Sequence, residues 1–362
     1  MTSALLQCHN PFLEMRINLR AIVDNYKKIQ NLTKTRVSSV VKADSYGLGT
    51  NPISKALYES GCQRFYVATL NEAFSLRKEL PHQAEIYLFN GFTKNHIDFL
   101  DEQNITPVLT SLNQLALWQK NHESFDLNFD TGINRLSIPQ SDLEKCLDQI
   151  DPSQVKTVMS HLACPDMPEY PLNKLQLDRF KEIAQHFPNS DKSLAASSGI
   201  TLGPEFHFDE VRIGVYLYGF LSNPHPHPGL HLTPAIKARA QILEVKNVEK
   251  GVSIGYDATF ISTKKMKIGT ISAGYADGIP LSYTNKGVFM LNNHPVPIIG
   301  RVSMDLCVVD LSDVPAKLAK VGKWVDLIPD PVSFCKASKE AGCSPREILT
   351  RFGQRYNRIY EK

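Results

Sequence analysis

Residues 37–49 read Val-Ser-Ser-Val-Val-Lys-Ala-Asp-Ser-Tyr-Gly-Leu-Gly, and this stretch decides how the rest of the chain is understood. Its apolar, β-branched start predicts a buried parallel strand. Lys42 then stands at the carboxyl end of that strand, before a Tyr-Gly-x-Gly turn whose glycines permit tight backbone geometry. Enzymes with α/β folds keep their chemistry at this edge, where a partly desolvated lysine can act as a Schiff-base amine or a proton acceptor. The alternative is an ordinary solvated lysine, and the later motifs argue against it.

Composition limits the class of protein. With 362 residues the chain exceeds what one core usually holds, so two domains are expected. A net charge of +3 favours neither nucleic acid nor an anionic membrane as a partner. No apolar run approaches transmembrane length, and residues 1–11 lack the features of a signal peptide. The seven scattered cysteines contain no Cys-x-x-Cys pair, which predicts reduced thiols in a cytoplasmic protein and no metal site.

Strands and helices alternate through the first part of the chain. A helical pattern occupies residues 13–35, with Asn18 as its N-cap. Further helices are expected at residues 71–78, 115–118, 141–150 and 172–187. The eight strand candidates are residues 37–41, 65–69, 85–89, 106–110, 125–130, 155–160, 193–197 and 211–213. Eight alternating units predict a closed (β/α)8 TIM-type barrel, although an open doubly wound sheet has the same pattern.

A different texture follows residues 223–229, which read Asn-Pro-His-Pro-His-Pro-Gly. Prolines at this density indicate a linker, and they dictate the spacing of the histidines, which argues against a metal site there. Beyond it we expect strands at residues 238–245, 267–272, 296–300 and 306–311 and a short helix at residues 344–350. The sequence therefore predicts a barrel domain over residues 13–230. A C-terminal mainly-β domain should cover residues 231–362, and residues 1–12 could add to it.

Seven further motifs follow the Lys42 segment. They are Asp130-Thr131-Gly132-Ile133-Asn134-Arg135, Met159-Ser160-His161, Ala195-Ala196-Ser197, Arg212-Ile213-Gly214-Val215, Ile254-Gly255-Tyr256, Gly274-Tyr275-Ala276-Asp277-Gly278 and Gly300-Arg301-Val302-Ser303-Met304-Asp305. Each is weak alone, but the ordered set closely resembles the alanine racemases, which are fold-type III pyridoxal-phosphate (PLP) enzymes. The resemblance extends from about residue 13 to the end of the chain. It implies a (β/α)8 barrel followed by a β domain, in a head-to-tail homodimer with shared active sites that acts on alanine.

The resemblance also implies which residues hold the cofactor. Lys42 matches the lysine that binds PLP covalently, and it should move the α-proton on one face of the substrate. Tyr46 and Ser197, with the backbone of Gly214 and Val215, match the groups that hold the phosphate. Amide and hydroxyl groups suit a dianion because they donate hydrogen bonds at close range.

Arg212 matches the arginine that faces the pyridine nitrogen. Because arginine only donates hydrogen bonds, the ring nitrogen must stay unprotonated to accept one. An unprotonated ring is a poor electron sink, which should suppress side reactions such as transamination. His161 is expected to orient Arg212 from behind.

Racemisation needs a base on each face of the α-carbon, and Tyr256 matches the second base, contributed by the partner subunit. Since the pKa of a free tyrosine is about 10, its surroundings must favour the phenolate. The resemblance further implies that Tyr275 lies at the active-site entrance and that the backbone amide of Met304 holds the substrate carboxylate. Arg135 should lie near that carboxylate and the phenolic oxygen of the cofactor.

Four positions depart from the family pattern. Asn128 stands where many members have a carbamylated lysine, and Ala196 replaces a frequent asparagine. Asp257 occupies a usual glycine position, and Gln354 lies where some members offer a tyrosine to the phosphate. Because Asn128 cannot be carbamylated, we expect no carbamate, and a small anion such as chloride, or ordered water, beside Arg135.

The expected protein is a cytoplasmic alanine racemase that supplies D-alanine for peptidoglycan. One alternative is a broader amino-acid racemase, acting on serine for example, which would differ only in pocket size. Fold-type III decarboxylases normally pair the ring nitrogen with a carboxylate, so Arg212 argues against them. A non-enzymatic PLP carrier of the single-barrel type would lack the second domain.

Overall fold

The structure, a computed structural model, describes residues 10–118, 124–221 and 229–362. It divides into two compact units. Of the described residues, the barrel unit comprises 20–45, 49–118, 124–221 and 229–233, and the β unit comprises 10–19, 46–48 and 234–362. The predicted linker, with both of its histidines, lies outside the described residues apart from Gly229.

Eight parallel strands form the ring of the barrel unit, in the order β10-β2-β3-β4-β5-β6-β8-β9. They are β2 (Arg36–Val40), β3 (Arg64–Val67), β4 (Glu85–Leu88), β5 (Ile105–Leu109), β6 (Phe125–Asp130), β8 (Val155–Met159), β9 (Asp191–Ser193) and β10 (Glu210–Ile213), with the short β7 (Ile138–Pro139) beside β6. The ring closes where the Arg212 amide donates to the Ala195 carbonyl at 3.0 Å and Ala196 bridges to Arg212. The predicted (β/α)8 barrel is therefore confirmed, and an open sheet is excluded.

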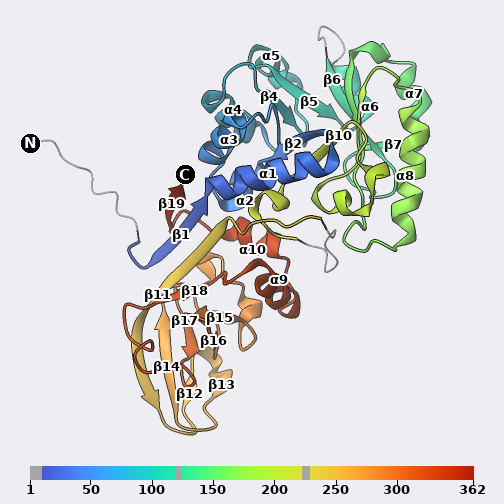
Figure 1. The fold of residues 1–362 in the computed structure, drawn as a ribbon. Helices are drawn as coiled ribbons and strands as arrows, with labels where there is room; N and C mark the ends of the chain where they lie inside the picture. The colour runs from blue at the N-terminus through green and yellow to red at the C-terminus, as the bar shows by residue number, and fades with distance from the viewer. Residues whose placement is uncertain (1–9, 119–123, 222–228) are drawn as a thin grey trace, which may run out of the picture. The chain divides into compact units, whose positions relative to one another are not determined.

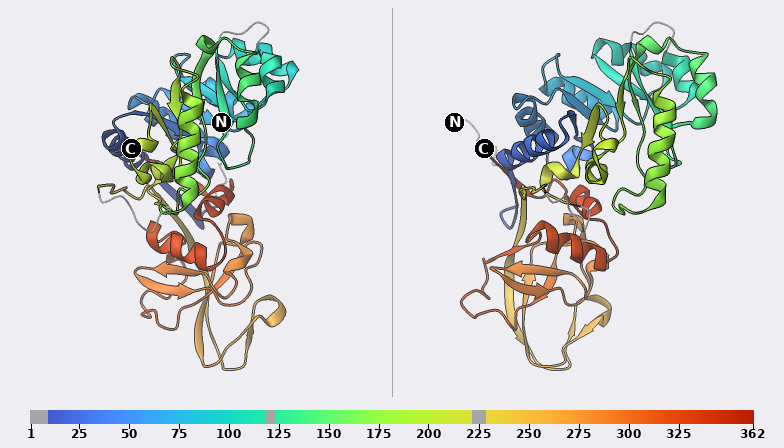
Figure 2. Two further views of the ribbon diagram at one scale, coloured as in Figure 1. Left: turned by 90° about the vertical axis from the view of Figure 1, so that its right-hand side faces the viewer. Right: turned by 45° about the vertical axis from the view of Figure 1, so that its right-hand side comes forward.

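Helices lie outside these strands, as Figures 1 and 2 show from different directions. They are α1 (Leu19–Thr33), α3 (Thr50–Glu59), α4 (Leu70–Glu79), α5 (Ile97–Glu102), α6 (Leu112–Trp118), α7 (Leu143–Leu147) and α8 (Pro171–Ala184). The short α2 (Lys42–Gly47) follows β2, and 3-10 turns occupy η4 (Ser197–Leu202) and η6 (Val215–Tyr218). Each predicted barrel strand is thus present. The prediction for residues 125–130 coincides with β6, and the boundaries of the others differ by up to four residues.

Inside the barrel, side chains form layers. Val40, Tyr66, Tyr87, Val108 and Met159 make a buried apolar layer, with Phe89 packed against it. Residues two positions earlier on the same strands point the same way. These earlier residues are polar, namely Ser38, Arg64, Glu85, Thr106 and Thr157. The barrel therefore has a polar floor at the amino-terminal ends of its strands, below an apolar middle.

The β unit is organised around the long strand β11 (Ile236–Val248). It pairs antiparallel with β1 (Leu13–Asn18), β14 (Met266–Ile271) and β18 (Trp324–Asp326). The other elements are β12 (Ser253–Ile254), β13 (Phe260–Ile261), β15 (Val288–Leu291), β16 (His294–Pro297), β17 (Cys307–Asp310), β19 (Asn357–Glu361), α9 (Pro331–Glu340) and α10 (Pro345–Arg351), with 3-10 turns η7 (Tyr256–Ala258) and η8 (Tyr275–Asp277). The predicted strands and the helix after Ser344 are confirmed, whereas α9 was not predicted.

One prediction about the N-terminal region was wrong. Residues 13–18 were included in a helical stretch, but they form strand β1, and the helix begins at Leu19. Leu13, Met15 and Ile17 alternate with polar residues and are buried. This period of two is the signal of a half-buried strand, and β19 pairs with β1 in parallel on its other edge.

Candidate active site

Lys42 lies just beyond the carboxyl end of β2, as the sequence predicted. Its Nζ atom is 5.7 Å from the centre of the Phe89 ring. Burial lowers the pKa of the Lys42 amine, the positive charge of Arg135 lowers this pKa further, and Glu72 acts in the opposite direction. Since burial disfavours the ammonium form, the neutral amine that nucleophilic or basic chemistry requires is easier to reach.

The residues after Lys42 form a left-handed helical turn. Ala43, Asp44, Ser45 and Tyr46 have φ values of 54°, 54°, 51° and 61°, and Gly47 follows at 80°. This conformation costs an L-residue roughly 1–2 kcal/mol, so neighbouring contacts must stabilise the turn. The Ser45 amide donates to the Val41 carbonyl at 2.9 Å, and the Thr50 amide donates to Asp44 Oδ1 at 2.9 Å.

Glu72 is a site residue that the sequence analysis missed. It is the third residue of α4, and its Oε2 atom accepts a hydrogen bond of 3.1 Å from the amide of the N-cap residue Thr69. The other oxygen of Glu72 accepts a hydrogen bond of 2.8 Å from the Ala43 amide, directly after Lys42. The Thr-x-x-Glu pattern is a capping-box signal that would have pointed to Glu72. It would not have revealed the contact with Ala43.

The end of the turn packs within the β unit. The Gly47 carbonyl accepts a hydrogen bond of 2.8 Å from Arg358, and the Leu48 carbonyl accepts one of 2.9 Å from the Tyr360 hydroxyl. A Cβ atom on Gly47 would lie 2.4 Å from the Leu349 carbonyl oxygen, so this position requires glycine. Burial raises the pKa of the Tyr46 hydroxyl. Its contact with a phosphate stays a prediction.

Arg212 is almost completely buried, at 3% exposure, on the strand next to β2. One terminal nitrogen donates to the Ser193 carbonyl at 2.9 Å and to the Ser193 hydroxyl, and the other donates to the Ser160 carbonyl at 2.6 Å. These bonds fix the guanidinium across the ends of β8, β9 and β10. His161 follows Ser160 directly, and its orienting role toward Arg212 stays a prediction.

Three of the four residues predicted to hold the phosphate, Ser197, Gly214 and Val215, come together beside Arg212. Ser197 Oγ accepts a hydrogen bond of 3.0 Å from the Gly214 amide, and both groups are buried. Val215 follows as the first residue of η6. Ala196, where asparagine is frequent in the family, lies in the bridge to Arg212 that closes the barrel. Ser197 and Gly214, which are 17 residues apart in the chain, are therefore neighbours in space.

The loop that carries Arg135 is held by two side chains of β6. Asp130 Oδ1 accepts from the Gly132 and Asn134 amides at 2.8 and 3.1 Å. The side-chain amide of Asn128 donates to the Leu136 carbonyl at 2.9 Å. Arg135 itself is exposed in the single chain, so its guanidinium is not a buried charge that requires a neighbouring anion there. The anion or ordered water expected beside it stays a prediction. Asn128 therefore holds the Arg135 loop through a neutral hydrogen bond.

Three separate motifs of the β unit also come together. The Tyr275 amide donates to the Ser303 carbonyl at 3.0 Å, and a Cβ atom on Gly274 would lie 2.3 Å from the Met304 carbonyl oxygen. A Cβ atom on Gly300 would lie 2.6 Å from the carbonyl oxygen of Ile254. The segments of Tyr256, Tyr275 and Met304 thus form one cluster. Their side chains are 68%, 43% and 53% exposed.

Two departures from the family pattern have a local explanation. Asp257 has a φ of 59°, a conformation that favours glycine but that aspartate tolerates better than most residues. Its carboxylate pairs with Arg301, next to the Tyr256 segment. Gln354 is exposed and accepts a hydrogen bond of 3.4 Å from Arg358.

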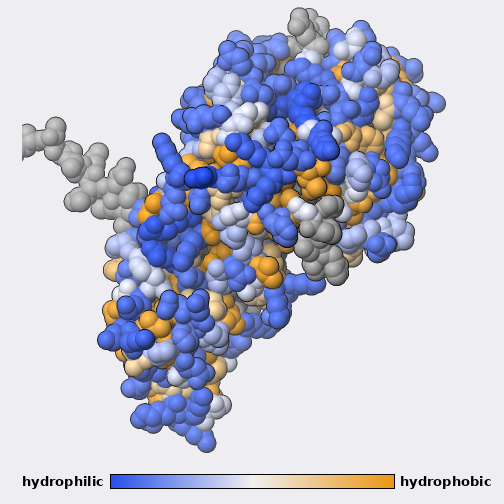
Figure 3. Space-filling model, viewed as in Figure 1, coloured by the Kyte–Doolittle hydropathy of each residue, from blue (hydrophilic) through white to orange (hydrophobic). Residues whose placement is uncertain are grey.

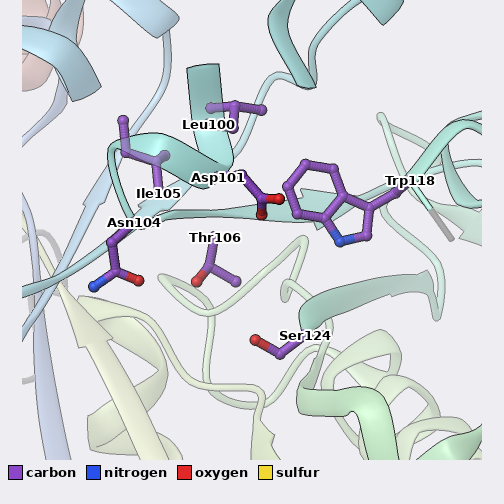
Figure 4. A pocket seen from close by; sticks show the side chains of 7 residues that line it. All are labelled: Leu100, Asp101, Asn104, Ile105, Thr106, Trp118 and Ser124. Carbon is purple, nitrogen blue, oxygen red and sulfur yellow. The ribbon is translucent and has the colours of Figure 1, made fainter. Parts of the chain in front are cut away.

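Other features of the described residues do not belong to this site. A pocket of about 340 Å³, lined by Asp101, Thr106, Trp118 and Ser124 among others, opens at the amino-terminal ends of β5 and β6 (Figure 4).

The face shown in Figure 3 is mainly hydrophilic, with hydrophobic residues in small groups. In the described part of the chain, no helix is long and apolar enough to span a membrane. The same residues contain no group of three or more His, Cys, Asp or Glu side chains suited to a metal ion.

Comparison with known families gives two matches that together cover most of the chain. The family described as alanine racemase, N-terminal domain, matches residues 17–222. The family described as alanine racemase, C-terminal domain, matches residues 235–360.

Individual relatives agree with these matches. An alanine racemase of Rickettsia africae is 38% identical over 96% of this chain and 98% of its own length. A biosynthetic alanine racemase of Agrobacterium fabrum is 34% identical over 96% of this chain and 93% of its own length. Among solved structures, the alanine racemase from Bartonella henselae with covalently bound pyridoxal phosphate is 36% identical. It covers 97% of this chain and 100% of its own, with a TM-score of 0.89.

Proposed function

The chain belongs to the alanine racemase family, and we propose that it interconverts L-alanine and D-alanine with PLP held on Lys42. The observation that carries this proposal is the Lys42 amine itself. It stands at the carboxyl end of a barrel strand with a lowered pKa, beside the strand of the buried Arg212. D-alanine made in this way would serve peptidoglycan synthesis.

The residues present suit PLP. A phosphate dianion needs hydrogen-bond donors, and the buried Ser197 hydroxyl, which accepts from the Gly214 amide, keeps its own hydrogen to donate. A pyridine nitrogen that accepts a hydrogen bond suits Arg212, which can only donate. Lys42, Tyr46, Ser197, Arg212 and the backbone from Gly214 would hold the group. When bound, PLP supplies the electron-withdrawing conjugation that acidifies the α-proton of the amino acid.

The protein's own groups then move the proton. Lys42 would accept or return it on one face, which requires the neutral amine that burial favours. Tyr256 of the partner subunit would do the same on the opposite face. Arg135 and the Met304 amide would hold the substrate carboxylate, and Tyr275 would line the entrance.

A homodimer is part of the proposal. Tyr256, Tyr275 and Met304 form one cluster on the β unit, and each is more than two-fifths exposed. Large side chains clustered at this exposure are typical of a surface that another chain covers. We place the protein in the cytoplasm, because all six cysteines in the described part of the chain are free thiols.

The test uses the purified protein with L-alanine and a panel of other amino acids that includes serine, followed by chiral chromatography. We expect racemisation of alanine well above that of the panel. Borohydride reduction followed by peptide mapping should label Lys42. A label on another lysine would contradict the site, and equal turnover of serine would favour a broader racemase.

A further inference from the structure

A buried charged cluster lies below Arg212 inside the barrel, and the proposed reaction does not use it. We call it the barrel-floor cluster and define it by Arg64, Tyr66, Asp126 and Glu210. Tyr66, Asp126 and Glu210 are each 0% exposed. Glu210 stands two residues before Arg212 on β10, so the two side chains point to the same face of the strand.

The hydrogen bonds of Tyr66 show how many protons this cluster holds. Its hydroxyl oxygen lies 3.3 Å from Glu210 Oε2 and 3.4 Å from Asp126 Oδ2. A carboxylate only accepts hydrogen bonds, and the hydroxyl has a single hydrogen to donate. If both carboxyls were ionised, one of these two contacts would set acceptor against acceptor in a buried site. A second proton on one carboxyl removes that conflict.

Asp126 is the better place for the second proton. Burial raises the pKa of Asp126 well above its ordinary value, and the negative charge of Glu210 raises it further, against the lowering effects of Arg64, Lys156 and the Thr157 hydroxyl. Burial also raises the pKa of Glu210, but Arg64 and the Ser38 hydroxyl, which donates to Glu210 Oε1, lower it. Glu210 is therefore the ionised member and Asp126 the neutral one.

The negative charge of Glu210 is available to Arg212. Arg64 lies 3.0 Å from Asp191 and 3.2 Å from Glu85, both closer than its 3.4 Å contact with Glu210. Arg212 has no carboxylate within 4.0 Å among the described residues. Its hydrogen-bond partners there are two carbonyls and a hydroxyl. A buried guanidinium without a counter-charge is costly.

We propose that Glu210 is a positioning residue that supplies the counter-charge of Arg212, while Asp126 beside it stays protonated. This inference rests on the proposed function, in which Arg212 faces the ring nitrogen of PLP. Glu210 compensates the charge of Arg212 from below, so the guanidinium keeps its orientation on Ser160 and Ser193. Without Glu210 the cofactor ring would experience a more positive potential.

The test compares two neutral isosteres by titrating the absorbance of the bound cofactor against pH. Glu210→Gln should lower the pH midpoint of the cofactor's absorbance change by at least about half a pH unit. A more positive site disfavours the protonated form of the bound cofactor, so that form should lose its proton at a lower pH. Asp126→Asn should leave the midpoint unchanged, because it replaces a group that is already neutral. Neither substitution alters the other charged groups around Glu210, which are Arg36, Arg64, Asp191 and Arg212.

A midpoint that does not move in Glu210→Gln, or that moves equally in both variants, would overturn the proposal. Infrared difference spectra of the wild-type protein against Asp126→Asn give a second readout that needs no Glu210 variant. The wild type should show the carbonyl stretch of a protonated carboxyl at neutral pH, and the variant should lack it. An absent band would also overturn the proposal. If the protein binds no PLP, the proposed function fails, and the infrared result still decides the state of Asp126.

Discussion

The two halves of the candidate site differ in how much of their environment one chain provides. In the barrel unit, Arg212 is 3% exposed and held by three hydrogen bonds, and burial lowers the pKa of Lys42. In the β unit, Tyr256 and Met304 are 68% and 53% exposed. The barrel half thus has a buried environment within one chain, whereas the β half is largely exposed there.

The largest effect should come from removing the exposed base. Tyr256→Phe should reduce racemisation by roughly 10²–10⁴-fold, the usual contribution of a positioned acid or base. Deuterium should still wash into the alanine enantiomer served by Lys42, since that half is complete within the barrel. Wash-in measured from each enantiomer checks this. Tyr170→Phe, at another exposed tyrosine, is the control and should be neutral.

Next in size is the recovery of activity in mixed dimers. Lys42→Ala and Tyr256→Phe should each be nearly inactive, and a mixture should regain roughly a quarter of wild-type activity. Half of randomly paired dimers are mixed, and one of their two sites has both bases. Activity measured after confirmed subunit exchange checks this. No recovery would mean that both halves of a site come from one chain.

A smaller effect should follow from the carboxylate that the sequence analysis missed. Glu72 raises the pKa of Lys42 against the effect of burial, so Glu72→Gln should lower that pKa further. The pH above which cofactor-free protein rebinds PLP should therefore decrease, and the rebinding rate should change a few-fold. Glu79→Gln, on the same helix but paired with Lys55, is the control. A shift in the opposite direction would contradict the role of Glu72.

The contrast between the halves also explains what the sequence could predict. The eight barrel strands could be predicted because strand and helix candidates alternate along the chain. Each strand was recognisable because burial on both faces of the sheet favours apolar runs such as Val40-Val41. The strand of Leu13, Met15 and Ile17 was missed although its period of two was visible, because the adjoining helical pattern was extended over it.

Other features could not be predicted from local sequence. The left-handed turn at residues 43–46 opposes the intrinsic preference of its residues, so it depends on tertiary contacts such as the one from Glu72. Asp126 and Glu210 lie on strands that are distant in the chain, and only the closed barrel brings them to one hydroxyl. The family resemblance predicts which residues contact substrate and cofactor, but it gave no indication of Glu72, Asp126 or Glu210.

A further modest effect concerns the loop of Arg135. Asn128→Ala removes the 2.9 Å hydrogen bond to the Leu136 carbonyl, which is worth about 1 kcal/mol. We expect kcat/KM for alanine to decrease about fivefold, mainly through KM. Asn128→Asp should behave similarly, because an ionised carboxylate cannot donate.

Wild-type activity should be the same with and without bicarbonate, and rescue by bicarbonate alone would show that a carbamate is still required.

The smallest effect on activity, and a clear one on stability, is expected at the barrel floor. The folded-state pKa of Asp126 is raised well above its unfolded value near 3.9. Between these two pKa values the folded chain keeps a proton that the unfolded chain releases, so wild-type stability decreases as the pH rises through this window. The Asp126→Asn variant has no such proton to lose. Its free energy of unfolding relative to that of the wild type should therefore increase from pH 5 upward, by at most about 1.4 kcal/mol per pH unit, and level off above the folded-state pKa of Asp126. Thermal unfolding of both proteins across this range checks the prediction, with Asp178→Asn as the exposed control. A gap that does not change with pH would mean that Asp126 is ionised in the folded barrel, and the barrel half would then carry an uncompensated charge that its hydrogen bonds do not explain.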